Sequence, residues 1–320
     1  MTTIGIVSPG AMGSALGRSW QAGGARVVCT VGGRSERTRR LAEGLEWLPD
    51  LVAVVSAADV VVSVGPPAAA PELAAAIADS CRRARVTPLV ADVNAVAPST
   101  MVRVAAVLTA AGCGVVDGAV SGPPPQQDGG SVTTVYLSGP SAAVLAELSA
   151  PGLEAVVVGG EIGKASAVKM CTASMYKGFT GLLLQALQAA HTNGVLDHVL
   201  ADLTPQFPHI ADAAAQIASA VAKSDRFPGE MREIARTQAD AGGLADLFEA
   251  LAGVYEAANA TALAAHTPEQ AATRTDLTAV LVELEQSRPC VPDRAAPAAE
   301  TVPAPPAEGE PGVDPRPAPS

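Results

Sequence analysis

The sequence predicts an α/β fold in which a doubly wound parallel sheet precedes an all-α domain. In the first half of the chain, short runs rich in Val and Ile alternate with stretches of helix-forming composition. This alternation is typical of parallel strands joined by helices. From about residue 163 onward there is no convincing strand, and apolar residues recur at helical spacing. The change of pattern divides the folded part of the chain into two domains.

The predicted strands are short, and several are almost continuously apolar, as strands covered on both faces are. They span Thr3–Val7, Ala25–Val31, Val60–Val64, Pro88–Val93, Gly114–Asp117 and Thr133–Ser138. The connections between strands and helices are short, which favours a parallel sheet with helices packed on it. The helices predicted among the earlier strands span Met12–Ala22, Glu36–Gly44 and Pro71–Arg83.

The second half is predicted to be helical. A long helix runs from Lys164 to Asn193 and is closed by Gly194, since glycine favours the conformation that ends helices. Further helices are predicted over Pro208–Lys223, Pro228–Ala241, Leu244–His266 and Pro268–Glu285. The last stretch is rich in Pro, Ala and Glu and has almost nothing to bury, so we expect a disordered tail. The expected domains are residues 1–162 and 163–288, followed by the tail at 289–320.

Composition and charge exclude several classes of protein. Of the 320 residues, 48% are hydrophobic, which is too many for a disordered chain. The net charge of −11 and the aromatic content of 3% argue against a nucleic-acid partner. The start has no basic leader, and no apolar run approaches the ~18 residues of a membrane span. We therefore expect a cytoplasmic protein with neither a nucleic-acid nor a membrane partner.

The cysteines and histidines argue against disulfide and metal chemistry. The five cysteines are odd in number, scattered and never in a CxxC pair, and the four histidines show neither HxxxH nor HExxH spacing. We expect no disulfide framework and no metal site. Cys171 is interpreted as a small buried apolar residue rather than as a nucleophile.

A glycine-containing turn joins the first predicted strand to the first predicted helix. In the G-x-G-x-x-G fingerprint, the first glycine makes the tight turn, the second lets the backbone approach a pyrophosphate, and the third packs helix against strand. Gly10 and Gly13 match the last two, and Ser8 replaces the first. The alternative is a turn in a ligand-free sheet. Because the start of a helix attracts anions, we predict a Rossmann-type dinucleotide site formed by Ser8, Pro9, Gly10, Ala11, Met12 and Gly13.

The residues after the second predicted strand indicate which dinucleotide binds. An acid there holds the ribose 2′-OH of NAD, whereas a 2′-phosphate needs arginine. The segment from Cys29 to Gly33 contains no acid, and it is followed by Arg34, Ser35 and Arg37. We therefore favour NADP, with NAD as the alternative. Glu36 is an objection, and the arginines would equally suit a solvated helix face.

Lysines gather at the start of the long predicted helix. The chain has four lysines, and Lys164, Lys169 and Lys177 all lie in this segment. Unlike arginine, lysine can transfer protons when burial or a neighbouring cation lowers its pKa. Lys169 and Lys177 are eight positions apart, so their helix faces are related. A solvated surface and a catalytic role are both compatible with this pattern.

Four segments together resemble the β-hydroxyacid dehydrogenase and 6-phosphogluconate dehydrogenase superfamily. The turn Gly5–Gly13 resembles its cofactor turn, Asp92–Pro98 its D-x-S-T-x-x-P segment, Asp117–Gly122 its D-A-P-V-S-G substrate loop, and Gly163–Lys169 its G-x-G-x-x-x-K motif. Met170–Leu184 and Arg226–Ala235 resemble one subgroup of this superfamily. In that subgroup the NAD-binding domain is followed by an uncharacterised C-terminal domain of phosphogluconate dehydrogenase type. The resemblance covers the chain from Thr3 to Leu284.

The resemblance implies roles for individual residues. Lys169 would be the general acid/base, and Ser121 and Gly122 would bind the anionic group of a small substrate. Asn94 would help to place the nicotinamide or the substrate, and Gly65 and Pro66 would contact the cofactor. For Ser121 and Gly122 a simple turn is the alternative, and for Asn94 a loop cap. The family further implies a homodimer whose helical domains build shared clefts.

The sequence also departs from the family. Thr172 and Ala173 stand where the family has two asparagines after the lysine, and Pro123–Pro125 stiffen the substrate loop. Lys177 is a candidate replacement for the missing polar group, and its charge would lower the pKa of Lys169. Glu230 and Glu233 are interpreted as a helix face or as structural ion pairs, with a place in the pocket as the lesser alternative.

The sequence therefore predicts an NADP-dependent oxidoreductase of β-hydroxyacid dehydrogenase type, acting on a small anionic hydroxy or keto compound. One alternative is an imine reductase that reduces C=N, although that group commonly lacks the lysine at position 169. The other is a catalytically silent NADP-binding protein.

Overall fold

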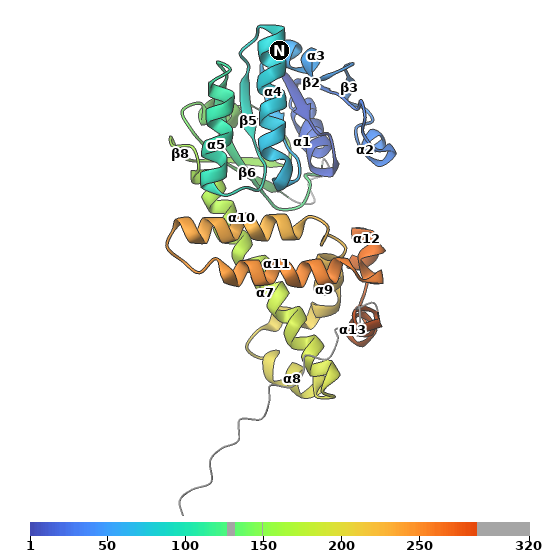
Figure 1. Ribbon diagram of the computed structural model, residues 1–320. Helices are drawn as coiled ribbons and strands as arrows, with labels where there is room; N and C mark the ends of the chain where they lie inside the picture. Colours follow the sequence, from blue (N-terminus) through green and yellow to red (C-terminus); the bar gives the residue numbers. More distant parts are fainter. Residues whose placement is uncertain (127–131, 149, 287–320) are drawn as a thin grey trace, which may run out of the picture. The chain divides into compact units, whose positions relative to one another are not determined.

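The Val- and Ile-rich segments of the first half form one sheet. In the computed structural model, which describes residues 1–126, 132–148 and 150–286, eight strands lie in the order β3-β2-β1-β4-β5-β6-β7-β8 (Figure 1). Neighbouring strands are parallel except β6 and β7. The strands are β1 Thr3–Val7, β2 Arg26–Cys29, β3 Glu46–Trp47, β4 Val60–Ser63, β5 Leu89–Asp92, β6 Gly114–Ser121, β7 Thr133–Ser138 and β8 Leu153–Gly159.

Helices cover both faces of this sheet, as a doubly wound fold requires. Alternate residues of β1 point to opposite faces, so Ile4 and Ile6 pack with Leu16 and Trp20 of α1, while Val7 joins the core beneath α4 and α5. The helices of this half are α1 Ala11–Ala22, α2 Glu36–Leu41, α3 Leu51–Ala57, α4 Ala70–Ala84, α5 Pro98–Thr109 and α6 Ala142–Ala146, with a 3₁₀ turn at Pro67–Ala69. The predicted fold class is confirmed.

Several predicted elements of the sheet domain need correction. Strand β6 was predicted to end at Asp117, but it continues to Ser121 because its second half pairs antiparallel with β7. The segment predicted as a substrate loop is therefore mostly a strand. Strands β3 and β8 and helices α3, α5 and α6 were not predicted. The sheet is consequently mixed at one end rather than purely parallel.

The long helix α7, Lys164–Thr192, is docked onto the sheet by a buried carboxylate. Asp117, in β6, accepts hydrogen bonds from the backbone N–H groups of Gly163 and Ser166 and from the hydroxyls of Ser138 and Ser166, at 2.7–3.2 Å. The bonded N–H groups belong to the start of the helix and have no partner within it. This network fixes where the first turns of α7 lie relative to the end of β6.

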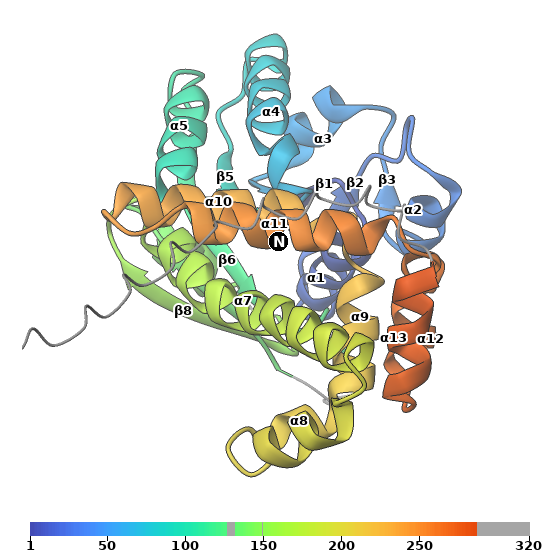
Figure 2. The same ribbon diagram turned by 60° about the horizontal axis from the view of Figure 1, so that its bottom comes forward.

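The remaining helices pack around α7. Figure 2 shows α10 and α11 side by side, and in Figure 1 α7 passes behind both, in contact with them and with α9. Two apolar cores hold this part together, one centred on Leu187 and Ile217 and the other on Met231 and Tyr255. Its helices are α8 Leu196–Leu203, α9 Ala213–Val221, α10 Phe227–Asp240, α11 Asp246–Asn259, α12 Pro268–Ala272 and α13 Leu277–Gln286, with 3₁₀ turns at Pro208–Asp212 and Ala262–Ala265.

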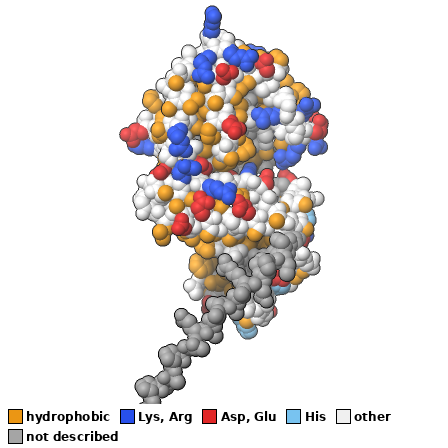
Figure 3. Space-filling model, in the orientation of Figure 1, with side chains coloured by type: hydrophobic (Ala, Val, Ile, Leu, Met, Phe, Trp, Pro, Cys, Tyr) orange, Lys and Arg blue, Asp and Glu red, His pale blue; other side chains and the backbone are white. Residues whose placement is uncertain are grey.

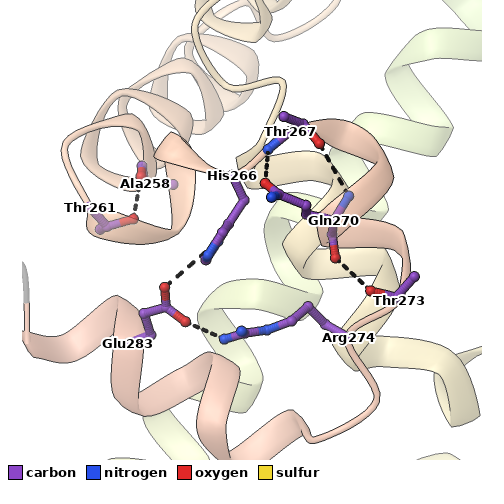
Figure 4. Close-up of polar contacts among 8 residues, drawn as sticks. All are labelled: Ala258, Thr261, His266, Thr267, Gln270, Thr273, Arg274 and Glu283. Carbon is purple, nitrogen blue, oxygen red and sulfur yellow. Dashed lines mark hydrogen bonds and ion pairs between the residues drawn. The ribbon is translucent and has the colours of Figure 1, made fainter.

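The helix predicted over Pro268–Glu285 is two helices. Thr267 and Gln270 form a capping box that starts α12, and the Asp276 carboxylate accepts the N–H of Ala279 at the start of α13. Arg274, in the connection, forms an ion pair with Glu283 of α13 (Figure 4). The helix predicted over Leu244–His266 likewise ends at Asn259, and α8 was not predicted. Local capping side chains therefore divide segments whose apolar spacing alone is continuous.

Residues Met1–Ser287 form one compact unit, and the predicted tail at 289–320 lies outside the described residues. None of the helices in the described ranges is both long and apolar enough to cross a membrane. On the face drawn in Figure 3, Lys and Arg side chains are interspersed with Asp and Glu.

Candidate functional site

One cavity of about 540 Å³ lies where the carboxyl ends of β1, β4, β5 and β6 face helices α7 and α10. Ligands of open α/β sheets bind outside these strand ends. The first half contributes Ser8, Gly10, Ala11, Met12, Gly13, Arg37, Gly65, Pro66, Asn94 and Gly122, among others. The helical half contributes Lys169, Lys177, Lys223, Arg226, Phe227 and Glu230.

The turn between β1 and α1 has the backbone of a glycine fingerprint although its first glycine is a serine. Ser8 adopts φ +67°, a left-handed conformation that glycine favours. A Cβ on Gly13 would stand 2.8 Å from both the Ser8 carbonyl oxygen and Val64 Cγ1, so only glycine fits between helix and strand. A Cβ on Gly10 would meet nothing within 4 Å.

The start of α1 is open toward the cavity. Gly10 is the N-cap of the helix and provides no side chain to satisfy the first N–H groups. The Ser14 hydroxyl donates to the carbonyl oxygen of Pro9, and neither Ser14 nor Pro9 lines the cavity. A cradle of this kind, with free N–H groups and space beside Gly10, fits a pyrophosphate.

The three residues predicted to select NADP take different positions. Arg37 lines the cavity. Arg34 lies beside the turn and donates a 3.0 Å hydrogen bond to the Ser8 hydroxyl, but it does not line the cavity. The Ser35 hydroxyl accepts the N–H of Thr38 as the N-cap of α2, so its oxygen is engaged in the helix start.

Asn94 lies at the cavity wall with its amide group occupied by neighbours. Its Oδ1 accepts the N–H of Gly65 at 2.5 Å, and its Nδ2 donates to the Ser63 hydroxyl and to the Asp92 carboxylate. Burial raises the pKa of Asp92 to about 6, and the hydrogen bonds from Asn94 and Ser63 oppose this. The structure thus shows Asn94 joining the ends of β4 and β5 and holding Gly65 in place.

Lys169 reaches the cavity from α7. Its Nζ donates a 2.8 Å hydrogen bond to the carbonyl oxygen of Val120 in β6. Burial lowers the pKa of Lys169, and the nearby charge of Arg226 lowers it further. A lysine with these properties can exchange a proton with a bound molecule closer to neutral pH than a solvated lysine can.

Lys177 lines the same cavity two helical turns farther along α7, so the predicted relation between the two lysines is observed. Its ammonium forms an ion pair with Glu230 and lies 4.6 Å from the centroid of the Phe227 ring. Burial, then the charges of Lys169 and Arg226, hold its pKa well below the usual value. The Lys177 side chain is 15% exposed, so it is not a solvated surface residue.

Of the two residues predicted to bind the substrate anion, Ser121 and Gly122, only Gly122 lines the cavity. Gly122 lines the cavity and has φ +115°, which other residues rarely adopt. Ser121 is the last residue of β6, opposite Thr134, and does not line the cavity. The backbone around Gly122 is therefore the part that faces the cavity.

Sequence reasoning missed three residues at the start of α10 and just before it, since Lys223, Arg226 and Phe227 line the cavity. Glu230 takes two of its expected roles, because it pairs with Lys177 and also lines the cavity. The segment Arg226–Ala235 resembles the family, but the sequence indicates no role for Arg226 or Phe227. Cys171, interpreted as buried, is exposed.

Comparisons with known proteins agree with this architecture. The NAD binding domain of 6-phosphogluconate dehydrogenase matches residues 3–157, and a domain of unknown function, DUF1932, matches residues 190–258. No curated protein matches the sequence.

Solved structures share the fold over most of the chain. The conserved protein MTH1747 of unknown function, whose structure is described as similar to 3-hydroxyacid dehydrogenases, is 25% identical with a TM-score of 0.59, covering 80% of this chain and 97% of that one. Mycobacterium tuberculosis 3-hydroxyisobutyrate dehydrogenase with L-serine is 17% identical with a TM-score of 0.59, covering 89% and 99%. A Streptomyces aurantiacus imine reductase is 14% identical with a TM-score of 0.50, covering 88% and 99%.

The family matches follow the two parts of the structure, since the first ends within β8 and the second begins near the end of α7. They also agree with the glycine turn and the helical half described above. The chain belongs to the 6-phosphogluconate dehydrogenase-like superfamily of NAD(P)-binding dehydrogenases and reductases, in the branch whose NAD-binding domain is followed by DUF1932.

Proposed function

We propose that the protein is an NADP-dependent oxidoreductase of β-hydroxyacid dehydrogenase type, which interconverts a small anionic hydroxy compound and its keto form. The observation that carries this proposal is the position of Lys169. A half-buried lysine with a lowered pKa shares one cavity with the glycine turn at the start of α1. A proton-transferring group would thus lie beside a dinucleotide cradle, which is the arrangement that a hydride-transfer enzyme requires.

The glycine turn and the arginines near it support NADP as the cofactor. The open start of α1 at Gly10 would hold the pyrophosphate, and Gly65 and Pro66 would border the nicotinamide half. Arg37 at the cavity and Arg34 beside Ser8 would bind the 2′-phosphate. The cofactor supplies hydride donation or acceptance at the reacting carbon.

Lys169 would perform the proton half of the reaction. In reduction its ammonium gives a proton to the carbonyl oxygen of the substrate, and in oxidation its neutral amine takes the proton from the hydroxyl. The hydrogen bond to Val120 fixes the direction of the lysine side chain. Burial and the charge of Arg226 lower the pKa of Lys169, so its neutral amine forms more readily than that of a solvated lysine.

The backbone around Gly122, with Ser121, would bind the anionic group of the substrate. Lys177 would contribute a further charge, oriented by Glu230 and the face of Phe227. Asn94 would act by holding Gly65 and the end of β5 beside the reacting groups, since its amide is engaged with the protein.

A homodimer is part of the proposal. Helix α7 exposes three large apolar side chains, Met175, Tyr176 and Leu182, at 72%, 75% and 57% of their surface. Exposed apolar groups along one helix favour association with a second copy. Light scattering coupled to size-exclusion chromatography is expected to give twice the mass of the chain, and a monomer at micromolar concentration would contradict this part.

Turnover tests the proposed function. Keto acids, semialdehydes and cyclic imines are to be incubated with NADPH and the decrease in its absorbance followed. We expect at least one carboxylate-bearing keto compound to be reduced. Reduction of cyclic imines alone would support an imine reductase, and tight NADPH binding without any turnover would support a silent binding protein.

A further inference from the structure

Positive charge gathers on one side of the cavity, where α10 begins. Among the described residues, the cavity is lined by five cationic side chains, Arg37, Lys169, Lys177, Lys223 and Arg226, and by one carboxylate, Glu230. This excess stands out in a chain whose net charge is −11. A cavity with low-dielectric walls concentrates such a field and attracts anions.

Glu230 balances only part of this charge. Its carboxylate forms the ion pair with Lys177, and its second oxygen lies 4.0 Å from Nε of Arg226, beyond hydrogen-bond distance. Within the described part of the chain, Lys223 has no carboxylate at ion-pair distance, although Glu269 acts on it from farther away. One carboxylate therefore serves both Lys177 and Arg226, Lys223 has none at ion-pair distance, and Arg226 and Lys223 can bind an external anion.

Arg226 is the centre of this group of cations. Its guanidinium carbon lies 6.0 Å from the centroid of Phe227, the ring that also carries the Lys177 ammonium. After burial, the charge of Arg226 contributes to lowering the pKa of Lys169, Lys177 and Lys223. Arg226 also occupies the N-cap position of α10, whose dipole adds positive potential there.

The charges expected of the cofactor have binding groups elsewhere. The pyrophosphate has the start of α1, and the 2′-phosphate has Arg34 and Arg37. One carboxylate on the substrate would be bound near Gly122 and Lys169. Arg226, whose side chain is 54% exposed, and Lys223 have no group of the cofactor or of this carboxylate assigned to them, so both can bind a further anion.

We propose that the substrate carries two anionic groups, carboxylate or phosphate, and that Arg226 and Lys223 bind the group remote from the reacting carbon. This inference rests on the proposed function, because it assumes that the cavity beside Lys169 holds the substrate. A planar guanidinium can bind a carboxylate or phosphate through two parallel hydrogen bonds, and Lys223 adds a point charge. Arg226 would then determine substrate specificity.

Binding of simple anions tests the proposal without turnover. Malonate and phosphoglycolate are the two-anion probes and acetate and glycolate the one-anion probes, each titrated calorimetrically into the enzyme with and without saturating NADP⁺. We expect the two-anion probes to bind at least tenfold more tightly. In Arg226→Gln this preference should fall to about twofold or less, while the binding of acetate and glycolate changes less than threefold.

Two controls separate the outcomes. Arg82→Gln removes the same charge from an exposed position of α4 outside the cavity and should leave every affinity unchanged. Lys223→Gln, which should reduce the same preference, serves if Arg226→Gln does not fold. Equal binding of one-anion and two-anion probes by the unaltered protein would overturn the proposal. A loss of NADPH affinity in Arg226→Gln as large as the loss for malonate would assign the cation to the cofactor instead.

Discussion

The ammonium group of Lys169 donates a 2.8 Å hydrogen bond to the backbone carbonyl oxygen of Val120. Val120 lies in β6, two residues before Gly122, which borders the cavity. One hydrogen bond therefore connects the residue proposed to move protons with the backbone proposed to bind the substrate anion. Asp117, in the same strand, accepts hydrogen bonds from the first turn of α7. The position of this turn and the direction of the Lys169 side chain therefore both depend on β6.

Two glycines of the cofactor turn should respond differently to alanine. Gly13→Ala places a methyl group 2.8 Å from backbone and Val64, so we expect a loss of about 1–3 kcal/mol in the free energy of unfolding. Gly10→Ala meets open space and should change stability by less than about 0.5 kcal/mol. It should nevertheless weaken NADPH binding by about tenfold or more, since backbone approach to the pyrophosphate is blocked. Urea unfolding and NADPH fluorescence titration measure the two effects, and unchanged NADPH affinity in Gly10→Ala would place the cofactor elsewhere.

Arg34 should distinguish NADPH from NADH. Arg34→Ala removes a charge beside Ser8, and we expect NADPH affinity to fall by about tenfold or more with little change for NADH, as for loss of a charge-assisted hydrogen bond. Arg39→Ala removes an exposed arginine of the following helix α2, which makes no hydrogen bond to Ser8, and is the matched control. Equal weakening of NADPH and NADH in Arg34→Ala would remove Arg34 from cofactor selection.

The ion pair between Lys177 and Glu230 should be important for stability. Both side chains are largely buried, so Glu230→Gln leaves an unbalanced ammonium and should lower the free energy of unfolding by about 3 kcal/mol. Glu256→Gln breaks an exposed pair with Arg232 and should cost about 1 kcal/mol or less. In the double variant Lys177→Met/Glu230→Gln, much of the loss should be recovered. Similar unfolding curves for Glu230→Gln and Glu256→Gln would contradict a structural role for the buried pair.

Asp92 should make stability depend on pH. Its pKa is raised from 3.8 to about 6 by burial, so the folded state holds the proton more tightly than the unfolded state. The resulting stabilisation is complete below about pH 3.8 and is lost as the pH rises through about 6. Relative to Asp92→Asn, the unaltered protein should therefore lose on the order of 3 kcal/mol between pH 4 and pH 7. Urea unfolding at several pH values measures this difference, and a difference independent of pH would show that Asp92 does not titrate in this range.

The parts of the fold that depend on local pattern could be predicted from the sequence. Strands β1 and β7 begin and end where their apolar runs do, and α7 ends one residue before the predicted position. The extension of β6 to Ser121 could not be predicted, because it depends on pairing with β7, a partner that the pattern of β6 does not identify. The break between α12 and α13 depends on capping by Thr267 and Asp276, which apolar spacing does not register.

The candidate site likewise has parts that local sequence motifs predict and parts that depend on packing between distant segments. The glycine turn and Lys169 belong to compact motifs and were identified directly. Glu230 and Arg226 reach the cavity only because α10 packs across α7, which brings them close to residues about 50 positions earlier in the chain. Asn94 was recognised as part of the site, but its hydrogen bonds to Gly65 and Asp92 required the adjacent ends of β4 and β5.

The central claim is that Lys169 transfers the proton, and Lys169→Ala tests it most directly. Turnover of a substrate found in the NADPH screen should be measured alongside NADPH affinity in the variant and in the unaltered protein. We expect kcat to fall by a factor of about 10²–10⁴, as for loss of a general acid or base, while NADPH affinity stays within about threefold. Turnover equal to that of the unaltered protein would contradict the proposed mechanism.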